Sequence, residues 1–489
     1  MEFETLAHLL KLLALVVVTY LVVTIVFPPI NFPRNIPTIP FYVSFLGSYT
    51  DLDQSQIYEL YLKHHLQKYG AVKIYFASRW NILVTRPEYL QQVFKEEDVF
   101  AKSGNQKKIP YAVLSRYTGD NVISAHGKVW KLYRSVITNS IQFPNKAPVA
   151  ENSKKLVKLL QEKIGDEPTI LAVGDFLQKF ALQNICESMV GVDFKLLDNS
   201  KDQELHQRLK FVKSQIFKPI YMNFPFLDKL PIPSRVKARE EVDKFRSYFT
   251  NKIKDEQSKP GANKEIAGYK LYEALQKGKI TEQQFTDNAV IILVAGHENP
   301  QLFFTSILYV LAKYPEWQHK LRDELDSIAL DDIETSKTLN SVLFEILRMY
   351  PPLGQIINRE TTKNTLLGSN IHIPKGAYVG YNNFATGRDS SHWRDEDEFK
   401  PERWGESNDE VLKNYKLAKI NCSLAAFHGG RRACLGEKFA LFEAKIFVKY
   451  IVESFNLELD PTWREKLTPA GPICPLMLRI KFEKISNRG

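Results

Sequence analysis

The longest unbroken apolar stretch of the chain lies at its beginning. Residues 12–27 are apolar except for two threonines and one tyrosine, and Leu9 and Leu10 extend the run upstream. A helix of about 20 apolar residues crosses a bilayer, so the pattern predicts a transmembrane helix near the short end of the range. A cleaved signal peptide is the alternative, although no small-residue cleavage site follows the run.

Prolines dominate the segment that follows, and they stand at positions 28, 29, 33, 37 and 40. Proline fixes φ and stops a helix, so this segment is predicted to be a semi-rigid extended hinge. The expected organisation is an anchor at residues 1–28, a hinge at 29–44 and one large folded domain at 45–489. Glu2 and Glu4 before the span and Arg34 after it favour a cytoplasmic location for that domain.

A long buried helix is predicted in the second half of the chain. Thr281 and Gln284 have the spacing of a capping box, and the apolar run 289–295 follows them. The pattern continues to about residue 313. Pro300 lies inside this helix, where it is expected to remove one backbone hydrogen bond and to kink the chain.

The rest of the large domain is predicted to be mostly helical, with a few short strands. Pro315 occupies the first position of another helix, and a further helix covers residues 336–349 before a pair of prolines stops it. Alternation of apolar and polar residues predicts strands near residues 72–75, 81–84, 370–381 and 476–482.

Composition narrows the class of protein. The chain has 489 residues, of which 44% are hydrophobic and 25% charged, so it is able to bury a large core. Its net charge of +10 suits a membrane surface or an acidic protein partner, and the scattered basic residues argue against nucleic acid. Four cysteines without a CxxC pair indicate a reducing compartment: Cys186, Cys422, Cys434 and Cys474.

One cysteine lies in a segment suited to cofactor binding. Residues 427–436 read FHGGRRACLG, and the apolar stretch after them predicts a long helix. Glycines on both sides of Cys434 allow the backbone to approach a flat cofactor. The helix amino terminus and the arginines are expected to lower the pKa of the Cys434 thiol and so to favour a thiolate, which is a haem ligand. A buried structural cysteine is the alternative.

The same decapeptide fits F-x-x-G-x-R-x-C-x-G, the haem loop of cytochromes P-450, and the chain therefore resembles this family. Two further motifs appear in the family's order. Glu345 and Arg348 resemble its E-x-x-R motif, and Arg403 lies in a segment, FKPERW, that resembles F-x-P-E-R-F. Taken alone, Glu345 and Arg348 would be an ordinary surface pair. The resemblance implies instead that they form a buried structural triad with Arg403.

The resemblance also implies the fold and the cofactor. The expected fold is mainly α, a triangular helical prism with a small β region, and it binds haem b with Cys434 as the axial ligand of the iron. Phe427 and Gly436 are expected to shape the haem loop. Arginine holds carboxylates in fixed geometry, and the residues expected around the haem propionates are Trp130, Arg134, Arg359 and Arg432.

A departure from the family pattern occurs in the long helix. Residues 295–300 read AGHENP where the family commonly has [AG]-G-x-[DE]-T, so Asn299 replaces a threonine. The resemblance implies that Gly296 leaves room for dioxygen and that Glu298 belongs to a proton relay. Without a hydroxyl at position 299, ordinary hydroxylation is less expected.

A closer resemblance is to the fungal members of the family that form dityrosine for the spore wall during sporulation. They join two N-formyltyrosines into N,N'-bisformyl dityrosine. The matching stretches are residues 100–111, 118–124, 291–302, 427–438 and 467–475. This resemblance implies an oxidoreductase of the endoplasmic reticulum membrane that uses dioxygen and NADPH, with electrons delivered by NADPH-cytochrome P-450 reductase.

The expected substrate carries a carboxylate, which requires hydrogen-bond donors. Basic and amide side chains at positions 102 and 105–108 offer them, above all Lys107 and Lys108, although a solvated basic loop is the alternative. Ile356 and Cys474 are expected in the same pocket. Two other functions remain open: a sterol or fatty-acid hydroxylase with an apolar pocket, and a non-catalytic haem-binding membrane protein, which would lack Gly296 and Glu298.

A surface that binds the reductase is also expected, because the enzyme must receive electrons from it. The reductase is an acidic flavoprotein, and a basic face on the Cys434 side of the molecule would steer it. The residues expected to form that face are Lys128, Lys131, Arg431 and Lys438.

Overall fold

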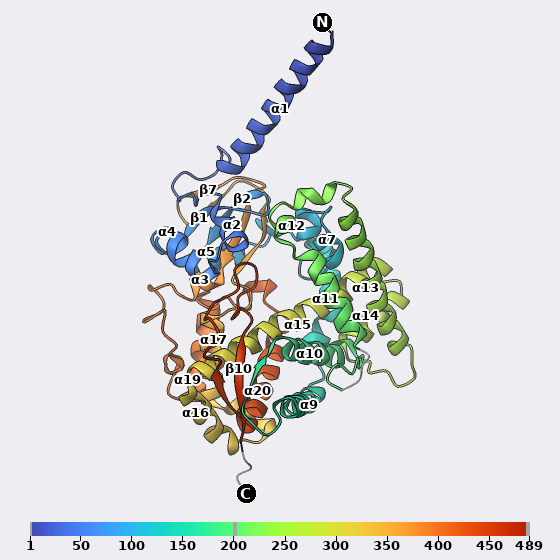
Figure 1. Ribbon diagram of the computed structural model, residues 1–489, viewed down its shortest axis with the longest axis vertical. Helices are drawn as coiled ribbons and strands as arrows, with labels where there is room; N and C mark the ends of the chain where they lie inside the picture. The colour runs from blue at the N-terminus through green and yellow to red at the C-terminus, as the bar shows by residue number, and fades with distance from the viewer. Residues whose placement is uncertain (1, 199–202, 486–489) are drawn as a thin grey trace.

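The computed structural model describes residues 2–198 and 203–485 and is built mainly of helices (Figure 1). In chain order the α-helices are α1 Glu2–Val26, α2 Val43–Tyr49, α3 Gln54–Ile57, α4 Lys63–Tyr69, α5 Pro87–Lys95, α6 Asn105–Lys108, α7 Val113–Thr118, α8 Gly127–Gln142, α9 Ala147–Ile164, α10 Gly174–Ile185, α11 Glu204–Ile216, α12 Pro219–Asn223, α13 Pro233–Gln257, α14 Ala267–Gln276, α15 Glu282–Lys313, α16 Pro315–Asp326, α17 Lys337–Met349, α18 Asn383–Thr386, α19 Asn408–Ile420 and α20 Glu437–Ser454. Short 3-10 or π segments are η1 Tyr58–Leu62, η2 Cys186–Val190, η3 Pro225–Lys229, η4 Leu330–Thr335, η5 Pro401–Trp404 and η6 Gly430–Arg432.

Three small sheets are present in the described part of the chain. The largest has the strand order β1-β2-β8-β5-β3, a second has β4-β10-β9, and β6 and β7 form a pair. The register of β5 shifts between Ile357 and Arg359, so Asn358 lies in a bulge. The strands are β1 Ala71–Phe76, β2 Arg79–Val84, β3 Phe100–Lys102, β4 Thr169–Ala172, β5 Gln355–Thr361, β6 Thr365–Leu367, β7 Ile371–Ile373, β8 Tyr378–Asn382, β9 Phe455–Leu459 and β10 Arg479–Lys484.

Helix α15 crosses the middle of the molecule (Figure 1). Its predicted capping box is present, because the backbone N–H of Gln284 donates to the Thr281 hydroxyl (3.2 Å) and the backbone N–H of Thr281 donates to the Gln284 side chain (2.9 Å). The helix continues through Pro300, whose missing N–H leaves the Gly296 carbonyl without its usual donor. Helices α16 and α17 also begin where the sequence predicted, at Pro315 and after Ser336.

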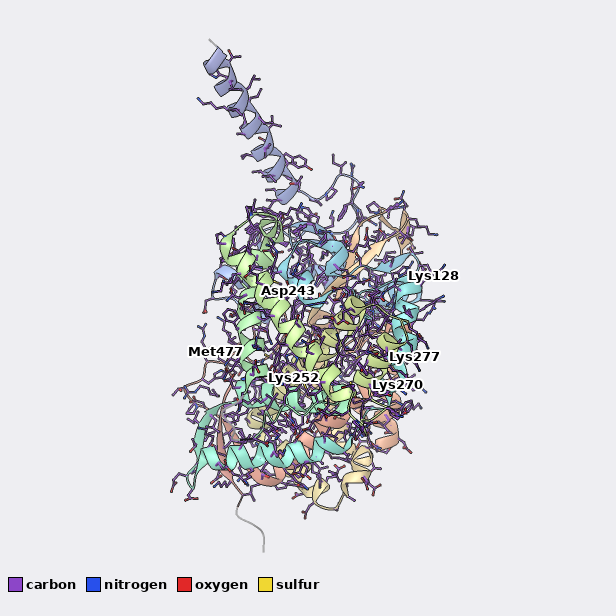
Figure 2. The ribbon with its side chains drawn as sticks, turned by 90° about the vertical axis from the view of Figure 1, so that its right-hand side faces the viewer. Lys128, Asp243, Lys252, Lys270, Lys277 and Met477 are labelled. Carbon is purple, nitrogen blue, oxygen red and sulfur yellow. The ribbon has the colours of Figure 1, made fainter. Side chains whose placement is uncertain are left out.

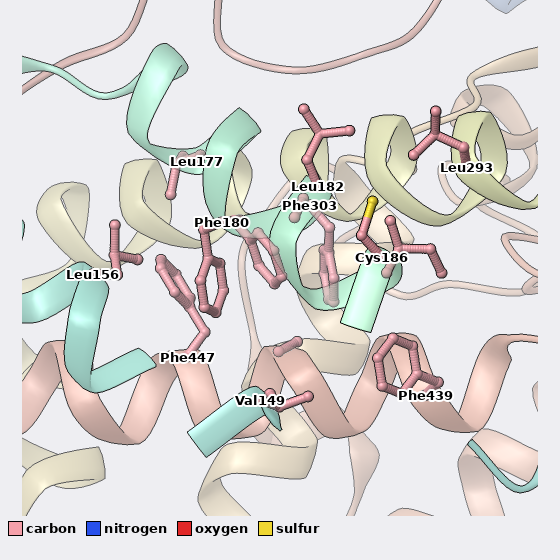
Figure 3. Close-up of a cluster of buried hydrophobic side chains, with 14 of the residues drawn as sticks. Val149, Leu156, Leu177, Phe180, Leu182, Cys186, Leu293, Phe303, Phe439 and Phe447 are labelled. Atoms are coloured by element: carbon pink, nitrogen blue, oxygen red, sulfur yellow. The ribbon is translucent and has the colours of Figure 1, made fainter. Parts of the chain in front are cut away.

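The main core lies where α10, α15 and α20 meet. Phe180 of α10 and Phe447 of α20 have ring centroids 5.7 Å apart, and Figure 3 shows them beside Phe303 of α15. Cys186 is buried in the same cluster. Aromatic pairs of this kind bury large apolar areas and hold helices in one register. The core thus fixes the central helix against the helix that follows Cys434.

Helix α1 contacts the domain only near its C-terminal end and projects from it (Figure 1). Residues His8–Val26 are long and apolar enough to cross a membrane, with a mean hydropathy of 2.7 and none of the span buried. The proline-rich segment after α1, predicted to be a semi-rigid hinge, is hydrogen-bonded to the domain in its second half. Ile39 donates to the Lys73 carbonyl (2.9 Å) and Lys73 donates to the Pro37 carbonyl (2.8 Å), so this segment packs along β1.

Candidate active site

The loop of residues 427–436 places Cys434 just before α20. The Cys434 side chain is exposed, yet desolvation raises the pKa of its thiol to about 11, so the sulfur borders an enclosed space rather than bulk solvent. Its backbone N–H donates to the Phe427 carbonyl (2.9 Å), which closes the loop. Gly436 is the N-cap of α20.

The pKa of the Cys434 thiol differs in direction from the sequence-based expectation. Backbone hydrogen bonds from Gly436 and Glu437 lower it, as a helix amino terminus should, but desolvation outweighs them. Arg432 does not contribute, because its guanidinium points to Glu97. A metal that binds this sulfur therefore displaces a proton from it.

Glycines and a histidine hold the loop against α5 and the large sheet. A Cβ on Gly429 would lie 2.4 Å from the Phe94 ring, and Gly430 has a φ of +61°. His428 accepts a hydrogen bond from Arg359 at Nε2 (2.8 Å), so its Nδ1 carries the proton and donates to the Tyr381 hydroxyl (2.6 Å). The loop is thereby fixed on two sides.

The middle of α15 borders an interior space. Its flanking residues are buried, whereas the partly exposed positions are 294–296, 298, 299, 301 and 302. The Asn299 amide has no hydrogen-bond partner among the residues that the structure describes. Gly296 also serves packing, because a Cβ there would lie 2.2 Å from Ile185 of α10. Its part in admitting dioxygen stays a prediction.

Glu298 lies between a lysine and a neutral histidine. It forms an ion pair with Lys213 of α11 (3.1 Å), and its Oε1 is 4.0 Å from Nε2 of His297. Burial lowers the pKa of His297 to about 4, and its Nδ1 donates to the Leu293 carbonyl (2.6 Å). The unpartnered Nε2 therefore presents a lone pair toward the carboxylate. Two acceptors at this separation suit a shared proton or a bridging water.

Several cations converge around one carboxylate on the same side as the Cys434 loop. Glu97 accepts hydrogen bonds from Arg359 (2.7 Å) and Arg432 (2.5 Å), and the Arg432 guanidinium stacks on the Trp130 ring at 3.9 Å. Both arginines are buried, and one nitrogen of each, Arg359 Nε and Arg432 Nη1, has no partner. A buried donor without an acceptor is costly, so these nitrogens indicate a missing anion.

Two more cations join this cluster without an acidic partner in the described part of the chain. Lys102 is 6% exposed, and desolvation together with Arg359 and Arg432 lowers its pKa well below the usual value. Arg134 is desolvated and contributes to the lowered pKa of Arg432. Four cations thus share one carboxylate. A flat cofactor with two carboxylates would balance all but one of the charges.

These residues fit the haem that the sequence implies. Cys434 would hold the iron, and Arg134, Arg359, Arg432 and Lys102 would hold the propionates. When bound, haem supplies the activation of dioxygen, and the chain supplies the thiolate ligand, the cations and the wall of α15.

The predicted triad is present, with Glu345 and Arg348 fully buried and Arg403 partly exposed. Glu345 accepts from Arg348 at both oxygens (2.8 and 3.0 Å) and from Arg403 (2.9 Å). The Trp404 indole donates to the same carboxylate (3.1 Å). Arg348 also donates to the carbonyls of Gly387 and Glu396 (2.6 and 2.7 Å). The cluster ties α17 to the irregular segment that leads toward the Cys434 loop.

Comparison with known proteins shows the family of the chain. The model of the family "Cytochrome P450" matches residues 37–484. The chain is a cytochrome P450. It is therefore a haem-thiolate oxidoreductase, and the haem and its cysteine ligand belong to the family as a whole.

Individual relatives extend the likeness. The P450 is 51% identical over 488 residues to Cytochrome P450-DIT2 of Saccharomyces cerevisiae, covering 98% of this chain and 99% of that one. It is 34% identical over 457 residues to the cytochrome P450 monooxygenase xanG of Aspergillus fumigatus, covering 89% and 85%. Among solved structures, the cytochrome P450DA haem domain has a TM-score of 0.75 at 16% identity, covering 93% of this chain and 99% of that one, which shows the shared fold.

Two of the residues predicted for the substrate, Lys107 and Lys108, lie away from the Cys434 loop. Lys107 pairs with Glu360 (2.8 Å) and is largely exposed, while Lys108 packs on Tyr378, on the other face of the large sheet from Tyr381 and His428. Cys474 is buried in the C-terminal turn, where its backbone bonds to Thr468. Ile356 is partly exposed on β5, three residues before Arg359 of the cation cluster.

Lys102 yields a prediction about haem retention. Replacing it with methionine keeps the apolar packing but removes one charge-assisted contact to a propionate, worth about 1.5–3 kcal/mol. We expect haem to leave the variant roughly 10 to 100 times faster, measured by transfer to apomyoglobin. Lys107→Met is the matched control, since Lys107 is exposed and paired with Glu360. Equal rates for Lys102→Met and the unaltered protein would contradict this placement.

Proposed function

We propose that this P450 joins two molecules of N-formyltyrosine through their rings to form N,N'-bisformyl dityrosine for a fungal spore or cell wall. The observation that carries the proposal is the Asn299 amide, unpartnered on the wall of α15 where a threonine is usual. The resemblance in five stretches to dityrosine-forming members supports it, as does end-to-end identity of 51% to Cytochrome P450-DIT2.

The chemistry requires orientation more than a strong acid or base. Each phenol loses one hydrogen atom, NADPH supplies two electrons, and dioxygen leaves as two waters. Free phenoxyl radicals couple indiscriminately, so the protein must hold two rings together before they react. The chain contributes the wall of α15 with the polar group of Glu298, His297 and Asn299.

Substrate binding separates this function from its closest rival. A sterol or fatty-acid hydroxylase of the same fold would bind an apolar ligand. We expect N-formyltyrosine to shift the haem absorption spectrum of the purified protein, N-formylphenylalanine to do so more weakly, and lauric acid or a sterol to have no effect. A shift with the lipids alone would favour the hydroxylase.

The polar group on α15 predicts unequal effects of two substitutions. Glu298 is the ionisable member that faces His297 and Lys213, so Glu298→Gln should lower dityrosine formed per NADPH by about tenfold or more. Asn299→Thr should cost less, because a hydroxyl also positions water. Released peroxide is measured in parallel, since a failed proton relay leaks peroxide. If Asn299→Thr stops coupling and Glu298→Gln does not, Asn299 binds the substrate instead.

We infer that α1 anchors the protein in the endoplasmic reticulum membrane with the large domain in the cytoplasm. There an NADPH-cytochrome P-450 reductase would dock on the exposed residues Lys128, Lys131, Arg431 and Lys438. Figure 2 shows Lys128 at the surface.

The membrane anchor is tested by truncation. Deleting residues 2–27 should release the protein from membranes washed with alkaline carbonate. Retention of the truncated protein in the washed pellet would contradict a single anchor.

A further inference from the structure

A buried lysine without an acidic partner lies on the sheet face opposite the Cys434 loop. Lys108 is 8% exposed, and its amine lies 4.9 Å from the Tyr378 ring and 5.9 Å from the Phe76 ring. No hydrogen bond or ion pair joins that amine to another residue in the described ranges. Side chains alternate between the two faces of a strand, so Tyr378 and Tyr381, three positions apart on β8, face opposite sides of the sheet. Tyr381 contacts His428 of the Cys434 loop, and Tyr378 faces away from it. Lys108 is thus outside the catalytic site.

Arg79 brings a second cation to the same ring. Its guanidinium lies 4.8 Å from the Tyr378 centroid, and its Nη2 donates to the Lys108 carbonyl (2.8 Å). Burial and the Arg79 charge lower the pKa of Lys108 to about 7. Glu360 does not neutralise this pair, because it is bound by Lys107 (2.8 Å) and reaches only the Tyr378 hydroxyl (3.4 Å). An anion bound by Lys108 and Arg79 would reduce the repulsion between their charges and the cost of burying the Lys108 amine.

Strand β2, which begins at Arg79, lies at the end of the domain from which α1 emerges (Figure 1). The Trp80 indole donates to the carbonyl of Thr24 in α1 (3.2 Å), and the Ser78 hydroxyl donates to the carbonyl of Asn223 in α12 (2.9 Å). Apolar side chains are exposed at this end: Ile30, Phe76, Ile220, Phe226 and Leu230. If α1 spans the bilayer, as proposed above, the lipid headgroups lie beside Arg79.

We propose that Arg79 and Lys108 bind the phosphate of a membrane lipid headgroup. Arginine matches two phosphate oxygens with its planar fork, and lysine adds a compact point charge. The Arg79 guanidinium and the Lys108 amine lie 4.8 and 4.9 Å from the Tyr378 ring centroid. The exposed Phe76 ring would lie against the lipid beside the bound phosphate. The site fixes the tilt of the domain on the membrane surface by a contact that α1 alone does not provide.

The test follows the chemical reactivity of the Lys108 amine in the full-length protein. The protein is labelled with an amine-acylating reagent near neutral pH in maltoside micelles, in vesicles of an uncharged galactolipid, and in vesicles of phosphatidylglycerol, and modification of each lysine is measured by mass spectrometry. We expect Lys108 labelling to be slower by about tenfold or more in phosphatidylglycerol than in galactolipid, because an adjacent anion keeps the amine protonated. Lys252, on the surface away from α1 (Figure 2), should show no such difference.

Substitution and free phosphate complete the test. Arg79→Gln should abolish the difference between the two vesicle types at Lys108, whereas Arg116→Gln, which alters an exposed pair with Asp243, should leave it intact. Equal labelling in both vesicles overturns the proposal, and so does full protection by inorganic phosphate in micelles, which would indicate a soluble anion. If the protein does not sediment with vesicles, the membrane anchor is wrong as well; sedimentation without Lys108 protection overturns the phosphate site alone.

Discussion

Replacing Cys434 with alanine is expected to abolish the red-shifted Soret band that the reduced carbon monoxide adduct of a thiolate-ligated haem shows. Of the four cysteines in the described part of the chain, only Cys434 is exposed and therefore able to bind the iron. It lies on a loop held by Phe427, Phe94 and His428. Haem bound by the remaining propionate contacts would have no sulfur ligand. Dityrosine formation should fall to background.

Cys422→Ala serves as the control for this experiment. Cys422 is buried and lies 12 positions before Cys434 in the sequence, outside the loop. Its variant should keep the red-shifted band, even if it is somewhat less stable. Retention of that band by Cys434→Ala, or its loss in a folded Cys422→Ala protein, would remove the assignment of the iron ligand.

Replacing Arg348 with alanine is expected to destabilise the fold by about 3–5 kcal/mol, because it leaves the Glu345 carboxylate buried with one charged partner fewer. Glu345 and Arg348 are both fully buried, and Arg348 also holds three carbonyl groups in the segment of residues 387–398. We expect a lower midpoint in urea unfolding and weak haem incorporation on expression.

Arg208→Ala is the matched control. Arg208 forms an ion pair with Glu204 one helical turn away, but both side chains are about 40% exposed (39% and 41%). Exposed pairs of this kind contribute at most about 0.5 kcal/mol. If the two variants unfold at the same urea concentration, the buried triad does not brace the fold.

Much of the fold was predictable from local signals. Helices α15 and α16 begin where the sequence indicates, because their start signals act within one helical turn. These signals are the capping box of Thr281 and Gln284 and the proline at position 315. Strand β3 was missed because its three residues, FAK, carry no alternation; it forms through pairing with β5, more than 250 residues away. The docked proline segment was also unexpected, since its bonds to Lys73 depend on the position of β1.

The site was predictable where a family motif exists and not where distant residues meet. Glu97 had no signal of its own, and its role depends on Arg359 and Arg432, which follow it by 262 and 335 residues. Lys102 was assigned to a substrate-binding loop because a charge pattern does not say which way a strand residue faces. The pKa of the Cys434 thiol is raised, not lowered as the sequence predicted, because desolvation depends on all the residues that surround the sulfur in the folded chain.

The most direct test of the proposed function is the isotopic composition of the product formed under ¹⁸O₂. The full-length protein is supplied with a reductase, NADPH and N-formyltyrosine, and the products are separated by mass spectrometry and by dityrosine fluorescence. We expect a fluorescent dimer that lacks two hydrogen atoms relative to two substrate molecules and contains no ¹⁸O. A monomeric product that carries one ¹⁸O would contradict it, because that product is hydroxylated rather than coupled.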